Sequence, residues 1–356
     1  MSTSTCLRKV VSGESDGALA GVVRGVFRVL SVPYAAVSSL SEILKTGQGG
    51  VRVDLPVISV GNLTVGGTGK TPLVSKLVSD LIARGRSPVI LSRGYAADAT
   101  GTNDEARVLS RAHPGVIHLQ HKNRAERAVY ASDACLGDTI VLDDGFQYHA
   151  LHRDLNICTL DATNPFGFDA VLPRGLLREP IAGLYRARPV VITRAELVTP
   201  EQIEAIKARV LEVNPYAKII VSEMVFTELV DVKDGAIAAS GSAPDSLAGE
   251  AVIAASGIGN PDAFRRGVAR CGARIRADVE KGDHHAWTAA DVASLARLAV
   301  ENSATAVVTT LKDAVKLAAL DWPADAPPLR ALDVEVRITE GADVWDALLD
   351  EILKGR

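Results

Sequence analysis

The sequence predicts a mixed α/β protein, with a doubly wound parallel sheet in one domain and a smaller α/β arrangement in a second. Short apolar runs with the length of buried strands alternate with longer segments of helical periodicity. In the first domain the expected strands are Val57–Val60, Pro88–Leu91, Ile140–Leu142, Leu155–Leu160 and Pro189–Thr193, separated by helical segments such as Leu73–Arg84 and Glu201–Val213. This alternation is typical of parallel strands joined by helical crossovers.

A second α/β stretch follows the first, with strand candidates Ala251–Ala255 and Ala306–Thr310. We therefore expect an N-terminal segment at 1–50, the first α/β domain at 51–224, a linker or β-ribbon at 225–239, and the second domain at 240–356. Domain interfaces are preferred ligand sites, so the second domain is expected to close a cleft over the first.

The composition indicates an ordinary soluble enzyme. Of the 356 residues, 47% are hydrophobic and 23% are charged, which excludes a disordered or fibrous chain. The formal net charge of −4 argues against a general nucleic-acid binder, so an anionic ligand must meet local basic clusters. The four cysteines have no metal-ligand spacing, which is typical of buried thiols in a reducing compartment. No feature indicates an obligatory protein partner.

The N-terminal region contains a long apolar run, Ala18–Ala36. Arg24, Arg28 and Pro33 interrupt it, so we expect no segment that spans a membrane. A signal peptide is disfavoured, because acidic residues precede the run and arginines lie inside it. Apolar side chains at helical spacing predict an amphipathic helix, with a face made of Val22, Val23, Val26, Phe27 and Leu30. This face either packs on the protein's own core or lies in a bilayer interface, with the arginines near anionic head groups.

A glycine-rich turn follows the first predicted strand, in the run VISVGNLTVGGTGKTP at Val57–Pro72. Glycines lack a Cβ and let the backbone approach a polyphosphate, and the helix that opens near Lys70 directs unpaired N–H groups at it. Lys70 would neutralise β- and γ-phosphate oxygens, and Thr71 would offer its hydroxyl to a magnesium ion. The expected nucleotide-binding residues of this phosphate loop are Gly66, Gly67, Thr68, Gly69, Lys70 and Thr71.

The loop departs from the usual phosphate-loop pattern at two positions. Thr64 stands where a glycine is expected five residues before Gly69. Val65 stands where partitioning-type ATPases, which share the GGxGKT variant, carry a lysine before the glycine pair. The alternative interpretation, a tight strand-to-helix turn without a ligand, does not account for the lysine and threonine that follow the glycines.

A second polar cluster lies in TIVLDDGFQYH at Thr139–His149, where an apolar strand ends in two aspartates and a glycine. Ligands of parallel sheets bind at the carboxyl ends of the strands. Asp143 or Asp144 would therefore complete the magnesium shell opposite Thr71. The pattern leaves open which of the two carboxylates touches the metal.

Further motifs extend these two along most of the chain. The stretches, in chain order, are VGNLTVGGTGKTPLV at 60–74, LSRGYA at 91–96, LDDGFQYHALHRDL at 142–155, LPRGLLREP at 172–180, SGIGNPDAF at 256–264, DHH at 283–285 and TTLKDAVKL at 309–317. In this combination the chain resembles the tetraacyldisaccharide 4′-kinases of lipid A biosynthesis.

The resemblance implies phosphorylation, by ATP and Mg²⁺, of the 4′-hydroxyl of an acylated glucosamine disaccharide 1-phosphate, a lipid-linked substrate. It implies a peripheral or monotopic enzyme on the cytoplasmic face of the inner membrane. It also favours the interfacial interpretation of the N-terminal helix, because this region is similar to the membrane-associating segment of the family.

The resemblance also implies residue roles. The family's proposed catalytic base lies in a GDEP motif, and here NDEA at 103–106 keeps both carboxylates, Asp104 as the base and Glu105 as a further candidate magnesium ligand. His284 matches the histidine that partners this base, with His285 as the alternative. Asp104, His284 and Lys70 form the expected catalytic set.

Arginines are expected at the phosphates. Arg178 is retained from the family's PAGPLREP motif and is expected at the nucleotide, whereas Arg174 and Leu176 depart from that motif. Arg124 and Arg174 are further candidates for bidentate contacts with ATP or with the phosphate of the substrate.

Two other classes of protein carry similar loops. A membrane-bound ATPase of the partitioning type would explain the loop and the N-terminal helix, but Val65 counts against it. A carrier or metal-insertion GTPase would need a guanine-reading Asn/Thr-Lys-x-Asp motif, and the nearest match, Thr310–Asp313, has leucine at the lysine position. Turnover that depends on a lipid-linked sugar acceptor distinguishes the kinase from both.

Overall fold

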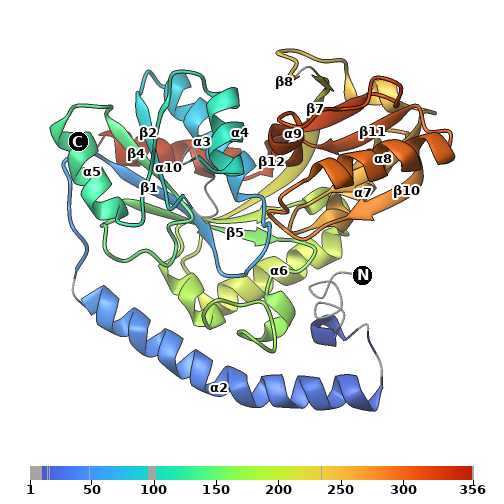
Figure 1. The fold of residues 1–356 in the computed structure, drawn as a ribbon. Coiled ribbons are helices and arrows are strands. Elements are labelled where there is room, and N and C mark those ends of the chain that lie inside the picture. Colours follow the sequence, from blue (N-terminus) through green and yellow to red (C-terminus); the bar gives the residue numbers. More distant parts are fainter. Residues whose placement is uncertain are drawn as a thin grey trace. The chain divides into compact units, whose positions relative to one another are not determined.

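The structure, a computed structural model, describes residues 10–13, 15, 17–47, 49–94, 102–233 and 235–354. Tyr95 and Ala96 of the LSRGYA stretch lie outside the described residues. The described residues divide into two compact units, which are coloured along the chain in Figure 1. The first unit contains those of Met1–Tyr95, His113–Met224 and Val336–Arg356, and the second contains those of Ala96–Ala112 and Val225–Glu335.

The first unit is built on a parallel sheet with the strand order β7-β6-β5-β1-β4-β2-β3. Its strands are β1 (Val57–Asn62), β2 (Pro88–Ser92), β3 (Ile117–Gln120), β4 (Thr139–Asp143), β5 (Leu155–Asp161), β6 (Val190–Thr193) and β7 (Ile219–Lys233). Strand β1 lies between β4 and β5, where the strand order reverses, and such a switch point is where ligands bind in open α/β sheets. The predicted α/β class with a mainly parallel sheet is confirmed.

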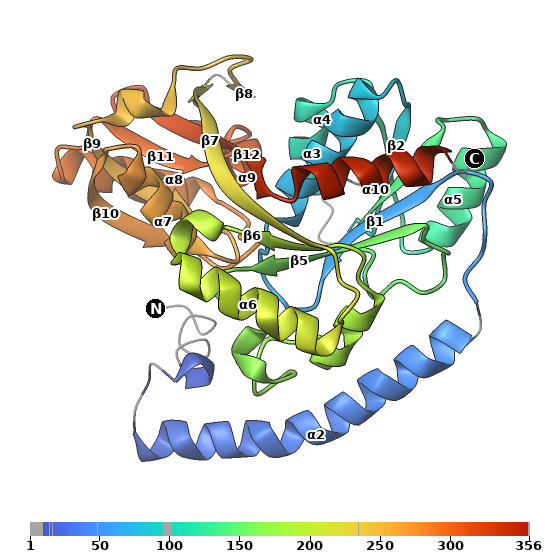
Figure 2. The ribbon, with the colours of Figure 1, turned by 180° about the vertical axis from the view of Figure 1, so that it is seen from behind.

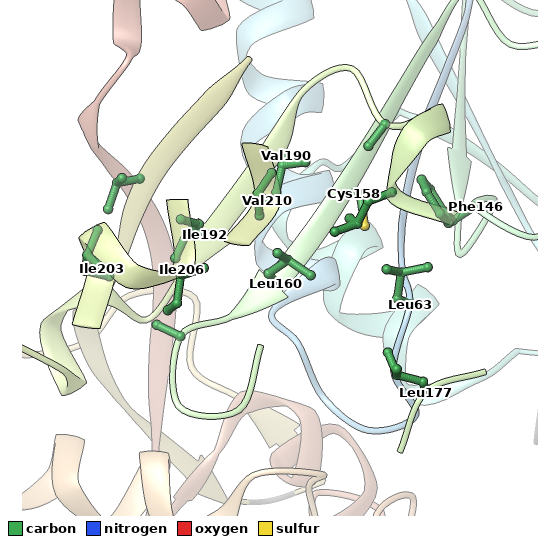
Figure 3. Close-up of a cluster of buried hydrophobic side chains, with 14 of the residues drawn as sticks. Leu63, Phe146, Cys158, Leu160, Leu177, Val190, Ile192, Ile203, Ile206 and Val210 are labelled. Atoms are coloured by element: carbon green, nitrogen blue, oxygen red, sulfur yellow. The ribbon is translucent and has the colours of Figure 1, made fainter. Parts of the chain in front are cut away.

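The first unit also contains α-helices and short 3₁₀ turns. The helices are α2 (Ala18–Gly47), α3 (Lys70–Ala83), α5 (Arg124–Asp133), α6 (Pro200–Val213) and α10 (Ala342–Lys354), with 3₁₀ turns at Gly167–Asp169, Ile181–Arg186 and Ala195–Leu197. Helix α6 begins at a capping box formed by Thr199 and Gln202, and the buried side chains Ile203, Ile206 and Val210 pack with those of β5 and β6 (Figure 3).

The second unit has its own parallel strands in the order β10-β9-β11-β12, followed by β7 with the short antiparallel strand β8. The strands are β8 (Ala236–Ile237), β9 (Ala251–Ser256), β10 (Arg274–Glu280), β11 (Ala306–Thr310) and β12 (Leu329–Glu340). The helices are α4 (Asp104–Ala112), α7 (Pro261–Arg270), α8 (Ala289–Glu301) and α9 (Leu311–Leu317), with a 3₁₀ turn at Pro244–Leu247. Alternate residues of β9 face opposite layers, Val252 toward the α7 cluster and Ile253 toward the α8 and α9 cluster.

The units differ from the expected boundaries at two places. The chain passes to the second unit at Val225, but strand β12 then returns it, so that α10 belongs to the first unit. Trp345 Nε1 of α10 donates to Asp80 Oδ2 of α3 at 2.7 Å, and the two helices lie side by side (Figure 2). Helix α4, expected in the first domain, belongs to the second unit, where Val108 packs on the α9 cluster.

Helix α2 is longer than the predicted amphipathic segment. It continues through Pro33 to Gly47, and Figures 1 and 2 show it as one continuous helix. Within the described residues it contains one stretch, Ala18–Glu42, that is long and apolar enough to cross a membrane by length and composition alone. The expectation of no such segment was wrong: it was based on the interruptions at Arg24, Arg28 and Pro33, but the helix continues through Pro33 and the stretch passes by length and composition. Many apolar side chains on α2 are exposed, so packing on the protein's own core does not account for them.

Candidate active site

The phosphate loop joins β1 to α3 in the first unit. Gly66 and Gly69 have φ values of 106° and 80°, a region that only glycine adopts without strain. Gly69 is also the N-cap of α3 and supplies no side-chain acceptor, so the N–H groups of the first turn have no side-chain cap. A loop of this shape before a helix N-terminus suits an anion.

Neighbouring strands hold the backbone of the loop in place. Thr193 Oγ1 donates to the carbonyl of Thr68 at 2.9 Å, and Arg194 Nη1 donates to the carbonyl of Gly67 at 2.8 Å. The side chain of Thr68 is buried, with its hydroxyl 2.8 Å from Thr159 Oγ1. Thr68 therefore anchors the loop through its side chain, which leaves its backbone N–H as the group that can reach a phosphate.

Lys70, Asp144 and Arg178 form an ion-pair network beside this loop. Lys70 Nζ lies 3.4 Å from Asp144 Oδ1 and donates to Asn62 Oδ1 at 3.1 Å. Arg178 Nη1 donates to Asp144 Oδ2 at 3.0 Å and to Oδ1 at 3.2 Å. Burial by itself raises the pKa of Asp144, but the charges of Lys70 and Arg178 outweigh it and lower the pKa to about 2. The structure thus joins three residues that the sequence assigned to three separate motifs.

The side chain of Arg124 holds the turn at Asp143–Gly145 through backbone carbonyls. Its Nη1 donates to the carbonyls of Asp143 at 3.2 Å and of Asp144 at 3.0 Å, and its guanidinium lies 4.0 Å from the centre of the Tyr148 ring. The side chain of Arg124 is buried. Arg124 therefore holds the turn that carries the carboxylates of Asp143 and Asp144. The sequence did not predict this supporting role.

The candidate magnesium ligands come from two places in the first unit. Thr71 lies in the first turn of α3, half-buried, and Asp143 is buried at the end of β4 next to Asp144. Hydroxyl and carboxylate oxygens are the hard donors that Mg²⁺ prefers, and phosphate and water oxygens usually complete its shell. Within the described residues there is no group of three or more His, Cys, Asp or Glu side chains that could hold a metal without such additional ligands.

Asp104 and His284 meet in the second unit. Asp104 is the first residue of α4, and His284 Nδ1 lies 3.1 Å from Asp104 Oδ2 and 3.2 Å from Oδ1. His284 has a φ of 58°, in a loop where its N–H donates to Asp283 Oδ1 at 3.1 Å. The hydrogen bond with Asp104 raises the pKa of His284, although burial and Lys312 act against it.

The second histidine of the pair has a different partner. His285 Nε2 lies 3.1 Å from Asp291 Oδ2, and its ring packs edge-on against Trp287 with 5.1 Å between the ring centres. Asp291 is also part of the capping box at the start of α8. His284, and not His285, is therefore the histidine that contacts Asp104.

Two lysines of α9 also contact this carboxylate, and sequence reasoning missed their part in the site. Lys316 Nζ lies 3.3 Å from Asp104 Oδ2, and Lys312 Nζ lies 4.0 Å from the same oxygen. Lys312 also pairs with Glu105 at 3.6 Å, so this candidate metal ligand has a cationic partner in the second unit. The available signal was the spacing of four between the lysines in TTLKDAVKL, which places them on one face of a helix.

Arg174 does not join the phosphate-loop network. Its Nη1 donates to the carbonyl of Val11 at 3.0 Å, and its backbone N–H donates to Ser31 Oγ of α2 at 3.0 Å. Arg174, which departs from the family motif, therefore contacts the N-terminal part of the chain at Val11 and Ser31.

The chain is similar to known proteins along most of its length. The chain matches the family described as LpxK, Tetraacyldisaccharide-1-P 4′-kinase, over residues 23–354. The tetraacyldisaccharide 4′-kinase of Anaeromyxobacter sp. (strain K) is 37% identical over 358 residues, covering 96% of this chain and 93% of the relative. That of Geobacter sulfurreducens is 33% identical, covering 99% of this chain and 100% of the relative. The crystal structure of the "apo" form of LpxK from Aquifex aeolicus in complex with ATP is similar with a TM-score of 0.68 and 25% identity, covering 93% of this chain and 99% of that chain. With a family match over nearly its whole length and curated relatives at this identity, the chain belongs to the tetraacyldisaccharide 4′-kinase family.

Proposed function

We propose that this enzyme transfers the γ-phosphate of ATP to the 4′-hydroxyl of an acylated glucosamine disaccharide 1-phosphate. The observation that carries the proposal is the network of Lys70, Asp144 and Arg178 at the phosphate loop of a chain in this family. In the reaction the 4′-oxygen bonds to the γ-phosphorus, the bond to the ADP oxygen breaks, and the hydroxyl proton passes to a base.

The first unit would bind the nucleotide. Backbone N–H groups of the loop and of the first turn of α3 would donate to phosphate oxygens, and Lys70 and Arg178 would place positive charge beside the γ-phosphate. Magnesium, when bound, would neutralise charge that develops on the phosphate oxygens. Thr71, Asp143 and Asp144 would hold it, with Glu105 as a further candidate. Asp144 and Glu105 both have cationic partners, Lys70 and Arg178 for Asp144 and Lys312 for Glu105.

The second unit would supply the base. Asp104 is held as a carboxylate by His284 and the two lysines of α9, so it can accept the proton of the 4′-hydroxyl. His284 would orient the carboxylate of Asp104 through its hydrogen bond and would share the proton that Asp104 accepts.

The acceptor is lipid-linked, which accounts for the exposed apolar face of α2. We propose that this face lies in the interface of the cytoplasmic leaflet of the inner membrane, where ATP is available and an acylated disaccharide stays in the bilayer. The exposed Arg28 would lie near anionic head groups, while Arg24 donates to the carbonyl of Ser15 at 2.9 Å.

The contacts of Asp313 argue against the alternative of a carrier or metal-insertion GTPase. Its carboxylate is fully buried and accepts hydrogen bonds from Gly257 N–H, Trp287 Nε1 and Thr310 Oγ1, at 2.8 to 2.9 Å. A carboxylate with these partners is not available to a nucleotide base.

One assay tests the function. The enzyme is incubated with ATP labelled at the γ-phosphate and with a detergent-dispersed acylated disaccharide 1-phosphate, and labelled lipid is separated by chromatography. We expect label in a bisphosphorylated lipid, and none when the acceptor is a 4′-deoxy analogue. ATP turnover that proceeds equally well without acceptor would instead indicate an ATPase and contradict the proposal.

A further inference from the structure

Helix α2 contacts the rest of the first unit through several polar groups and through Ala35, while it leaves most of its larger apolar side chains exposed. The contacting residues recur every three or four positions and so form one stripe, made of Ser31, Tyr34, Ser38 and Glu42. Exposed apolar side chains include those of Val22, Val26, Val29, Val37, Leu40 and Leu44, which are 51–71% exposed. An internal helix of a soluble protein normally has the opposite arrangement, with its apolar stripe on the core.

Ser31, Tyr34 and Ser38 of this stripe contact one segment of the chain, Val171–Arg178, whereas Glu42 pairs with Arg186. Ser31 is buried, and its hydroxyl lies 3.0 Å from the carbonyl oxygen of Val171. Tyr34 Oη and Ser38 Oγ both donate to the carbonyl of Arg178, at 3.0 Å and 3.3 Å. Two donors on one carbonyl fix the orientation of that peptide group.

The same segment is bonded to the residues that lead into the phosphate loop. The N–H of Arg178 donates to the carbonyl of Leu63 at 2.7 Å, and the N–H of Val65 donates to the carbonyl of Leu176 at 2.8 Å. Beyond its backbone, Arg178 reaches Asp144, which in turn pairs with Lys70. Arg178 is therefore held by α2 at its carbonyl and by the phosphate-site network at its guanidinium.

We propose that Tyr34 and Ser38 are positioning residues for Arg178. By fixing the carbonyl of Arg178, they set where its guanidinium lies relative to Lys70 and the bound phosphates. A helix with one face in the bilayer and the other on Arg178 thereby keeps the phosphate site in its working arrangement. This inference rests on the proposed function, because it assigns Arg178 to the phosphates of ATP. Its physical basis is that small displacements of a charged group from the transferring phosphate cost large factors in rate.

The test uses the full-length enzyme with Tyr34→Phe and Ser38→Ala combined, which removes both hydroxyls and keeps the ring. We expect kcat for the lipid acceptor to fall about tenfold, the loss expected for two hydrogen bonds. The affinity for ATP, measured by calorimetry without acceptor, should weaken as well. Co-sedimentation with anionic vesicles should not change, and the thermal midpoint should fall by only a few degrees, as expected for two lost hydrogen bonds. Ser39→Ala is the matched control, since in the described part of the chain Ser39 makes no bond to the Arg178 segment.

The decisive comparison repeats the double change in an Arg178→Ala background. If Tyr34 and Ser38 act through Arg178, the double change then lowers neither kcat nor ATP affinity any further. An equal tenfold loss in that background would overturn the inference, as would wild-type kinetics of the double variant. Should the double variant melt early, Tyr34→Phe alone is compared in the two backgrounds. If the wild type fails to phosphorylate the acceptor, the proposed function is contradicted. The calorimetric measurement of ATP affinity still tests the positioning role in that case.

Discussion

His284 Nδ1 lies 3.1 Å from Asp104 Oδ2, although the two residues are 180 positions apart in the chain. The fold brings them together because α4, which begins at Asp104, packs against α9 in the second unit, near the loop that carries His284. Burial alone would raise the pKa of Asp104, but the hydrogen bond with His284 and the charge of Lys312 hold it well below its usual range. Asp104 is therefore a carboxylate at neutral pH, and the contacts that lower its pKa also lower its intrinsic affinity for a proton.

Replacing Asp104 by Ala should lower kcat by about 10²-fold or more, with little effect on the KM for ATP, because a base acts in the chemical step. Initial rates at saturating acceptor measure this. Asp262→Asn, which removes an exposed carboxylate paired with Arg265 in the same unit, is the control and should keep wild-type rates. A rise in the ATP KM at unchanged kcat would make Asp104 a binding residue.

The pKa of His284 should lie above its ordinary value of about 6.5, because the protonated ring is stabilised by Asp104. The folded state then binds this proton more tightly than the unfolded state does. The resulting stabilisation is complete below the unfolded pKa and is lost as the pH rises through the folded pKa. NMR titration of the histidine rings should show the raised pKa in the wild type and a lower one in Asp104→Asn. His285→Gln leaves the pair intact and serves as the control. The same pKa for His284 in the wild type and in Asp104→Asn would show that the contact does not form in solution.

Lys70→Ala should reduce phosphoryl transfer at least about 10²- to 10³-fold, more than any other single change, because it removes charge from the place where the transition state concentrates it. Lys76→Ala is a matched control on the same helix, since Lys76 pairs with Asp80 on α3. Both variants are assayed with labelled ATP after their folding is checked by circular dichroism. Near-normal turnover by folded Lys70→Ala would contradict the assignment of the loop between β1 and α3 as the phosphate-binding loop.

Replacing Asp143 or Asp144 by Ala should raise the magnesium concentration that gives half the maximal rate, because a hard oxygen ligand is lost. The Asp144 variant should in addition raise the KM for ATP, since Lys70 and Arg178 lose their shared partner. Titration of magnesium at fixed free ATP separates these effects. Unchanged magnesium dependence in both variants would place the metal elsewhere.

The strands that the sequence predicted are those with continuous apolar runs. Strand β1 is buried along its whole length, and such a run is read from sequence without tertiary information. Strand β10, with the sequence RIRADVE, alternates exposed and half-buried residues and carries charges, because it lies at an edge of its sheet. Its alternation of polar and apolar residues is the pattern of a half-buried strand, but it lacks the continuous apolar run that marked the predicted strands.

The site was predictable where one motif supplies several groups, as in the phosphate loop. Most contacts between motifs were not predictable from the residues, since they depend on how the chain packs; the pairing of Asp104 with a histidine of DHH came from the family resemblance. The choice between His284 and His285, the supporting role of Arg124 and the two lysines of α9 all needed the fold. The unit to which α10 belongs likewise depends on long-range contacts such as that of Trp345 with Asp80.

The exposed face of α2 leads to the last prediction. Val22, Val26 and Val29 are 63%, 51% and 71% exposed, so changing all three to Ser removes apolar surface without opening a cavity in a core. Membrane insertion gains about 0.8 kcal/mol per buried CH₂, so this triple variant should leave anionic vesicles and phosphorylate vesicle-borne acceptor slowly. Its thermal midpoint and its ATP affinity should stay close to wild type. A control triple variant changes Val129, Leu211 and Val300, exposed apolar residues outside α2, to Ser and should bind vesicles normally. Early melting of the α2 variant with unchanged vesicle affinity would instead mean that this face stabilises the protein and does not contact lipid.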